Sequence, residues 1–78
     1  MPRYYFHLQD GHTLLDSDGL ELIDLAAAQK EAVRASADVL KGGPGATLWE
    51  GTPWRLWVTD KPDGGGQTFF TLRFSAET

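Results

Sequence analysis

The opening segment, residues 3–9, carries large side chains on both faces of a predicted strand. Because side chains alternate across a strand, one face presents Tyr4, Phe6 and Leu8. The opposite face presents Arg3, Tyr5, His7 and Gln9. A small domain needs only one apolar sheet face to build its core. The second face therefore predicts a surface that contacts something else.

Segments 54–59 and 68–74 repeat this alternation near the end of the chain. On one face they place large apolar side chains, namely Trp54, Leu56 and Val58, then Phe70, Leu72 and Phe74. On the other face they place a mixed set, namely Arg55, Trp57 and Thr59, then Phe69, Thr71 and Arg73. The polar, glycine-rich residues 60–66 between the two segments predict a loop.

A hairpin is predicted directly after the first strand. Asp10 and Gly11 are typical turn residues, and residues 13–15 begin a return strand. Residues 16–19 interrupt this strand, and residues 20–22 resume it. We expect a bulge or a second turn at the interruption, because its last residue is a glycine, which adopts positive φ readily.

A single helix is predicted from Leu25, with Asp24 as its N-cap. Its apolar stripe follows the helical period and is mostly alanine: Leu25, Ala28, Ala32, Ala35 and Val39, widened by Ala26, Val33 and Leu40. The glycine and proline residues at 42–44 predict its end. Such small side chains allow the helix to lie close to a sheet whose strands supply the bulk of the core.

These segments predict an α+β domain with its elements in the order β-β-α-β-β. The sheet is expected to be mostly antiparallel, with about four strands and one helix packed on one face. At 78 residues, the chain has room for a single small domain spanning residues 1–78. Two alternatives then exist for the second sheet face. Either the loop of residues 42–53, which contains Trp49, covers it, or it stays open.

Composition limits the cellular compartment and the partners that we expect for the protein. The chain contains no cysteine, which fits a cytoplasmic protein and leaves no thiolates for a metal cluster. Its formal net charge of -4 repels nucleic-acid phosphates at long range, so nucleic acid is not the partner we expect. No apolar segment approaches the ~20 residues that a membrane-spanning helix needs, so we expect no membrane partner.

No motif in the chain predicts catalysis, a cofactor or a metal. His7, Asp10 and His12 surround one turn, but their spacing does not preorganise a metal site. Residues 16–21 lack the spacing of a calcium loop and predict a turn whose carboxylates accept backbone N–H groups. The serines lack a nucleophile-elbow context, and the glycines at 64–66 precede no phosphate-binding lysine. We therefore expect a protein that is not an enzyme.

The chain also resembles a known family along nearly its whole length. The matching segments are PRYYFHL at 2–8, DGLEL at 18–22, Asp24 and Leu25 before the Ala-Ala and Glu-Ala pairs of the helix, VTD at 58–60 and TLRF at 71–74. They resemble a family of short bacterial proteins classed as a domain of unknown function. This resemblance implies no activity, cofactor or partner.

The second sheet face carries the only set of residues that predicts a function: Tyr5, His7, Arg55, Trp57, Phe69 and Arg73. Aromatic and arginine side chains dominate the energetics of interfaces. We therefore expect a small non-enzymatic protein-interaction module that forms a homodimer, or binds a protein partner, through the open sheet face. Interleaved aromatics and arginines also stack single-stranded bases on small sheets. A single-stranded nucleic-acid-binding or antitoxin-like regulatory domain is therefore the alternative.

Overall fold

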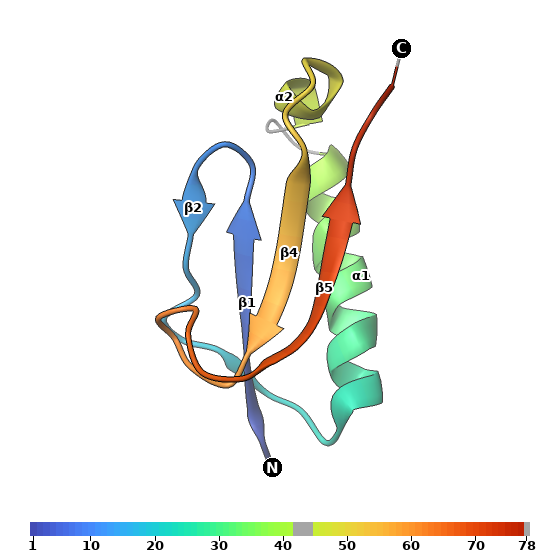
Figure 1. Ribbon diagram of the computed structural model, residues 1–78. Coiled ribbons are helices and arrows are strands. Elements are labelled where there is room, and N and C mark those ends of the chain that lie inside the picture. The colour runs from blue at the N-terminus through green and yellow to red at the C-terminus, as the bar shows by residue number, and fades with distance from the viewer. Residues whose placement is uncertain (42–44, 78) are drawn as a thin grey trace.

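The computed structural model describes residues 1–41 and 45–77 (Figure 1). Its elements in chain order are β1 (Arg3–Gln9), β2 (Thr13–Leu14), β3 (Leu20–Glu21), α1 (Leu25–Lys41), α2 (Gly45–Trp49), β4 (Trp54–Thr59) and β5 (Thr68–Phe74). The α+β class and the single main helix between two groups of strands are confirmed. The return strand is split into β2 and β3, and α2 occupies a segment that was predicted as a loop. The predicted helix end at 42–44 lies outside the described residues.

The strand pairs are all antiparallel, and the strands lie in the order β2-β1-β4-β5. The short strand β3 pairs with the beginning of β1, where Arg3 lies opposite Glu21. β1 and β4 form the centre of the sheet, with Phe6 opposite Val58. In the described part of the chain, β5 pairs only with β4. Its outer edge therefore presents backbone groups that have no strand partner.

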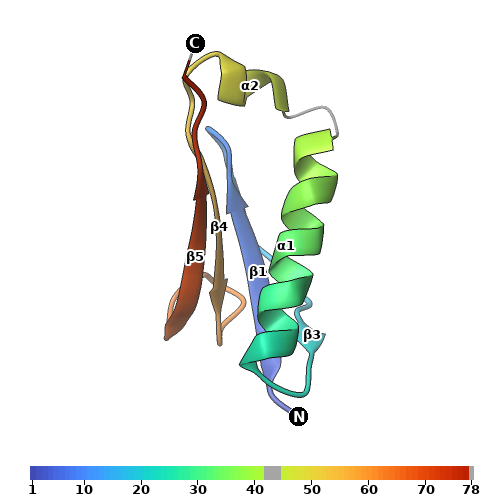
Figure 2. The same cartoon turned by 90° about the vertical axis from the view of Figure 1, so that its right-hand side faces the viewer.

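Helix α1 lies along one face of the sheet (Figure 2). Asp24 caps it as predicted, because its carboxylate accepts a hydrogen bond from the Ala27 N–H at 2.9 Å. Ala28 and Ala32 are fully buried, and their short side chains allow the helix to lie close to the strands. The buried core cluster consists of Tyr4, Ala28, Ala32, Leu56 and Val58.

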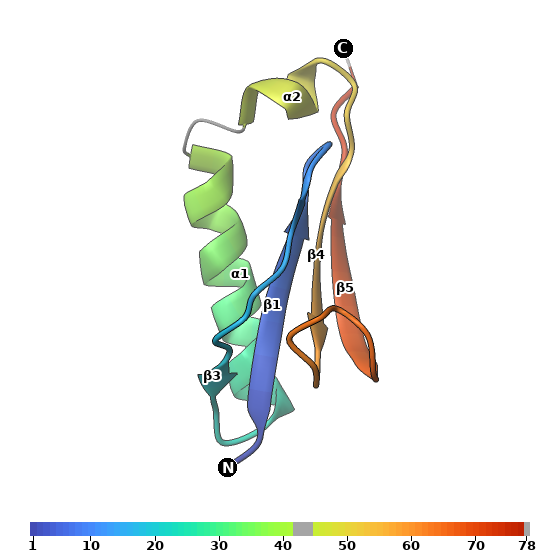
Figure 3. The same ribbon diagram turned by 90° about the vertical axis from the view of Figure 1, so that its left-hand side faces the viewer.

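Asp16 lies in the segment between β2 and β3, where the chain runs along the outer edge of β1 (Figure 3). Its carboxylate accepts hydrogen bonds from the backbone N–H groups of Phe6, Asp18 and Gly19, at 3.0, 3.1 and 3.0 Å. Gly19 has a φ of 69°, and a Cβ there would lie 2.8 Å from the Tyr5 ring. The predicted turn, with a carboxylate that accepts backbone N–H groups, is therefore confirmed.

A β-bulge between β4 and β5 changes which way Phe69 points. Val58 pairs with Phe70 and Thr59 pairs with Thr68, so Phe69 is an extra residue opposite β4. Strict alternation predicted that Phe69 lies on the second sheet face. The structure instead packs its ring edge-on against Tyr4 in the core, with the ring centroids 5.2 Å apart. The prediction for Phe69 was wrong because an extra residue interrupts the alternation.

Candidate functional site

The other five residues of the predicted surface come together on the second sheet face. Tyr5 and His7 lie on β1, Arg55 and Trp57 on β4, and Arg73 on β5. The register places His7 opposite Trp57, and Arg55 opposite Arg73. The pairing of the sheet therefore brings together side chains that are far apart in the sequence.

His7 is fully buried in a chain of hydrogen bonds at the centre of this face. Its Nδ1 accepts the backbone N–H of Asp16 at 3.1 Å, so the ring proton is assigned to Nε2. Nε2 then donates to Thr59 Oγ1 at 2.9 Å, and that hydroxyl donates to the Lys61 carbonyl at 2.7 Å. Both ring nitrogens have partners, which gives His7 a structural role in joining three segments.

Trp57 lies beneath segments of its own chain and is only 7% exposed. The backbone of Gly64 crosses its indole, since a Cβ on Gly64 would lie 3.6 Å from Trp57 Cζ2 and 3.1 Å from Leu15 Cδ2. Arg55 stacks over the same indole, with its guanidinium carbon 4.2 Å from the ring centroid. The second face is therefore closed over Trp57.

The segment that covers Trp57 is not the loop of residues 42–53 that the sequence offered as a cover. The connector between β4 and β5, residues 60–67, folds toward the segment after β2 (Figure 1). Trp49, in contrast, is 66% exposed and does not provide the cover. Instead, α2 is tied to the start of β4, where Trp54 Nε1 donates to Thr47 Oγ1 at 2.9 Å.

Asp16 connects the segment between β2 and β3 to β1 through the backbone N–H of Phe6 and the His7 ring. Partial burial by itself raises the pKa of Asp16, but the N–H donors of Gly19, Phe6 and Asp18 together outweigh it. The pKa of Asp16 therefore lies below its ordinary value of 3.8. The ionised carboxylate is the form that holds the break between β2 and β3 in place.

An open cleft of about 340 Å³ lies at one end of the second face. Its lining comes from three strands and the segments beside them: Gln9, Gly11, Thr52, Pro53, Trp54, Arg55 and Arg73. Arg55 Nε donates to Gln9 Oε1 at 2.8 Å, so the two side chains are joined across β1 and β4. Two of the predicted surface residues, Arg55 and Arg73, therefore line a concave site.

A second, apolar groove of about 250 Å³ lies between α1 and β5, on the opposite face of the sheet. Its lining is Val33, Ser36, Ala37, Leu40, Leu72 and Phe74. Ser36 Oγ is buried there with no hydrogen-bond partner in the described part of the chain. Sequence reasoning assigned no function to this groove, although Val33 and Leu40 widened the predicted apolar stripe of the helix.

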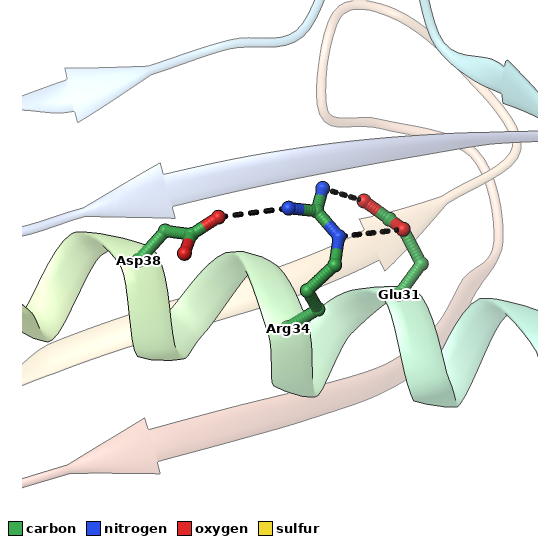
Figure 4. A network of polar contacts seen from close by, with 3 residues as sticks. All are labelled: Glu31, Arg34 and Asp38. Carbon is green, nitrogen blue, oxygen red and sulfur yellow. Dashed lines mark hydrogen bonds and ion pairs between the residues drawn. The ribbon is translucent and has the colours of Figure 1, made fainter.

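The other flank of α1 is charged. Arg34 lies between Glu31 and Asp38 and makes ion pairs with both, at 2.8 Å to Asp38 (Figure 4). The hydrogen bond from Arg34 lowers the pKa of Glu31. Helix α1 therefore has three sides: a buried face on the sheet, a charged flank and an apolar flank beside β5.

Residues 1–41 and 45–77 hold neither a metal-binding cluster nor a membrane-spanning helix. These residues contain no group of three His, Cys, Asp or Glu side chains placed to hold a metal ion. His12 is exposed beyond the β1–β2 turn, away from the buried His7 network. No described helix is both long and apolar enough to span a bilayer.

Comparison with known proteins gives a family for the chain. A family model described as a domain of unknown function, DUF6894, matches residues 3–75. The chain belongs to this family. No curated protein and no solved structure matches it. The whole architecture described above, from β1 through β5, falls within the DUF6894 match.

Proposed function

We propose that this domain is a small non-enzymatic interaction module that pairs with a second copy of itself along β5. The open outer edge of β5 is the observation that carries the proposal. Proteins usually protect such an edge with proline, with charged side chains or with a covering segment. Residues 68–74 contain no proline and only one charged side chain, Arg73. A second β5 offers a strand of equal length to complete the edge.

The apolar groove also favours a second copy of the chain as the partner, because the groove lies directly beside the edge of β5. Leu72 and Phe74 from β5 form one wall, and Val33 and Leu40 from α1 form the other. Val33 is 61% exposed. The charged flank of α1, with Arg34 at its centre, lies on the other side of the helix (Figure 4). The side of the molecule that carries the open edge is therefore also the apolar side.

Symmetry joins the edge and the groove into one interface. Antiparallel pairing of two copies of β5 creates a two-fold axis perpendicular to the sheet, so each copy contributes the same surface. Both copies of α1 then lie side by side on one face, and the two grooves meet across the axis. This arrangement adds apolar burial to a chain whose own core is small.

Charge disfavours one register of this pairing. An axis through Leu72 places Phe70 opposite Phe74 of the partner subunit, and Thr71 opposite Arg73 of the partner subunit. An axis through Arg73 would instead place two like charges directly opposite each other, which is unfavourable across a strand pair. Among the registers that avoid this contact, we propose the one centred on Leu72, because it places the apolar residues Phe70 and Phe74 of the two subunits opposite each other.

Self-association was also expected from the sequence, but through the second sheet face; the dimer proposed here uses the edge of β5 instead. The centre of the second sheet face is closed, because Gly64 and Arg55 cover Trp57. Single-stranded nucleic-acid binding or antitoxin-like regulation is less well supported, since bases stack on exposed rings. A protein partner other than a second copy would use the same edge of β5.

Sedimentation equilibrium at micromolar concentration tests this function. We expect the wild-type chain to be a dimer and Val33→Lys to be a folded monomer, because Val33 is exposed within one subunit and buried in the dimer. Ile23→Lys is the matched control, because Ile23 is also exposed but lies before α1 and does not line the apolar groove. A monomeric wild type, or equal dissociation by Ile23→Lys, would contradict the proposal.

We also propose a bacterial and cytoplasmic setting for the protein. The support is the resemblance of its opening residues to short bacterial proteins and a cysteine-free composition, which fits a reducing compartment. Fractionation of a bacterial host that carries the natural gene, followed by detection of the chain, tests this. Recovery from the membrane or the secreted fraction would contradict it.

A further inference from the structure

Two arginines lie side by side at the cleft end of the second sheet face without an acidic neighbour. Arg55 and Arg73 are direct cross-strand partners on β4 and β5. Like charges in this position destabilise a sheet. Among the described residues, no carboxylate lies within ion-pair distance of either guanidinium. The chain as a whole has a net charge of -4, so this local concentration of positive charge is unusual for it.

The guanidinium of Arg55 is held in place by contacts that leave most of its donors available. Its Nε donates to Gln9 Oε1 at 2.8 Å, and its guanidinium carbon lies over the Trp57 indole, 4.2 Å from the ring centroid. Its terminal amino groups have no acceptor among the described residues. A guanidinium offers five N–H donors in a planar fork that matches a carboxylate or a phosphate. Arg55 is thus oriented by neutral contacts that do not neutralise it.

The surroundings of the two arginines form a cleft of small-molecule size. Its volume is about 340 Å³, within the range of ligand sites in proteins. Pro53 contributes to its lining beside the two arginines and Gln9. Because Gln9 Oε1 accepts the hydrogen bond from Arg55 Nε, the amide nitrogen of Gln9 is available as a further donor. The cleft therefore combines a cationic, hydrogen-bonding side with an apolar side.

From this geometry we propose that the cleft binds the oxyanion of a small organic acid, either a carboxylate or a phosphate, between Arg55 and Arg73. The anion would remove the repulsion between the two guanidiniums and would accept charge-assisted hydrogen bonds from both. Pro53 would contact the non-polar part of the ligand. The proposal does not depend on pairing through β5, because all of these residues belong to one subunit.

Titration with inorganic phosphate and with acetate, each at an ionic strength held constant with sodium chloride, tests the site. The readout is the nuclear magnetic resonance signal of Arg55 Nε–H and of the Trp57 indole N–H. We expect saturable shifts with at least one of the two anions, and the tighter binder identifies the class of acid. Shifts that stay linear with both anions would overturn the proposal.

Matched variants separate a specific site from a general effect of charge. Arg73→Gln should weaken binding by about tenfold, because one charge-assisted contact is lost. Arg55→Lys keeps the charge but loses the planar fork, and should also weaken binding. Arg3→Gln removes the same charge elsewhere, at an exposed ion pair with Glu21, and should leave binding unchanged. If Arg3→Gln weakens binding as much as Arg73→Gln, the site is not specific.

Val33→Lys, the variant that we expect to be monomeric, distinguishes anion binding in the cleft from dimer formation through β5. Val33 lies on α1, on the opposite face of the sheet from the cleft. We therefore expect Val33→Lys to bind phosphate or acetate as tightly as the wild type does. A loss of binding in this variant would show that the cleft requires the partner subunit, which would overturn the single-subunit site.

Discussion

The side chains of His7 and Thr59 meet 2.9 Å apart between β1 and β4, and both are fully buried on the sheet face that α1 does not cover. Thr59 Oγ1 accepts from His7 and donates to the Lys61 carbonyl, so one hydroxyl connects two strands and the connector that follows β4. A polar chain of this kind stabilises a buried site only while every member has a partner.

Thr59→Val should therefore destabilise the domain although it preserves shape. The substitution leaves the His7 Nε2 proton without an acceptor and should lower the free energy of unfolding by about 1–3 kcal/mol. Thr71→Val, on the same sheet face but only half-buried, is the control and should change stability by less than about 0.5 kcal/mol. Urea unfolding measures both. Equal losses in the two variants would show that the His7 bond contributes nothing.

Gly19 and Gly51 form a matched pair for testing the packing of the turn against β1. Both have positive φ, at 69° and 95°, so alanine strains either backbone by roughly 1–2 kcal/mol. A Cβ at Gly19 would also lie within 2.9 Å of the Tyr5 ring and Arg3 Cγ, whereas a Cβ at Gly51 meets nothing within 4 Å. We expect Gly19→Ala to cost more than Gly51→Ala in thermal unfolding. The reverse order would contradict the described turn.

The lowered pKa of Asp16 makes stability depend on pH in a predictable direction. In acid, the unfolded chain binds a proton at Asp16 more readily than the folded chain does. The contribution to stability is therefore complete above the ordinary pKa of 3.8, and it is lost as the pH falls through the lower folded value. Asp16→Asn removes this titration.

The measurement is the free energy of unfolding of the wild type and of Asp16→Asn across the acidic range. We expect the wild type to lose stability more steeply on acidification, so that the two curves converge at low pH. Parallel curves would mean that the backbone N–H groups of Phe6, Asp18 and Gly19 do not favour the ionised carboxylate.

Periodicity predicted the elements of this fold well because they are regular. The alternation in residues 3–9 and the alanine stripe after Asp24 correctly gave β1, α1 and the sheet face on which α1 packs. The N-cap at Asp24 was also predictable, since it depends only on neighbouring residues. These features are local, and local patterns are visible in a single sequence.

The remaining features depend on contacts between distant segments. The bulge at Phe69 follows from how β5 aligns with β4, and no residue near Phe69 indicates it. Gly64 covers Trp57 because a connector folds back across the sheet, which alternation along a strand does not predict. The apolar groove was partly visible in Val33 and Leu40, but its position beside an open edge required the strand order.

Cysteine cross-linking tests the central claim, the symmetric pairing of β5 about Leu72, most directly. The natural chain contains no cysteine, so every disulfide reports introduced residues alone. The proposed register places residue 71 of one subunit opposite residue 73 of the other, within the roughly 4.5–5.5 Å between Cα atoms of an antiparallel pair, which a disulfide can bridge. Thr13→Cys mixed with Leu14→Cys provides a control at β2, on the opposite edge of the sheet.

We predict that a mixture of Thr71→Cys and Arg73→Cys chains forms a disulfide-linked heterodimer under mild oxidation, well above the level of either variant alone and of the β2 control. Efficient cross-linking of Thr71→Cys with itself would contradict the register. Cross-linking of the mixture no higher than that of the β2 control would contradict pairing through β5 altogether.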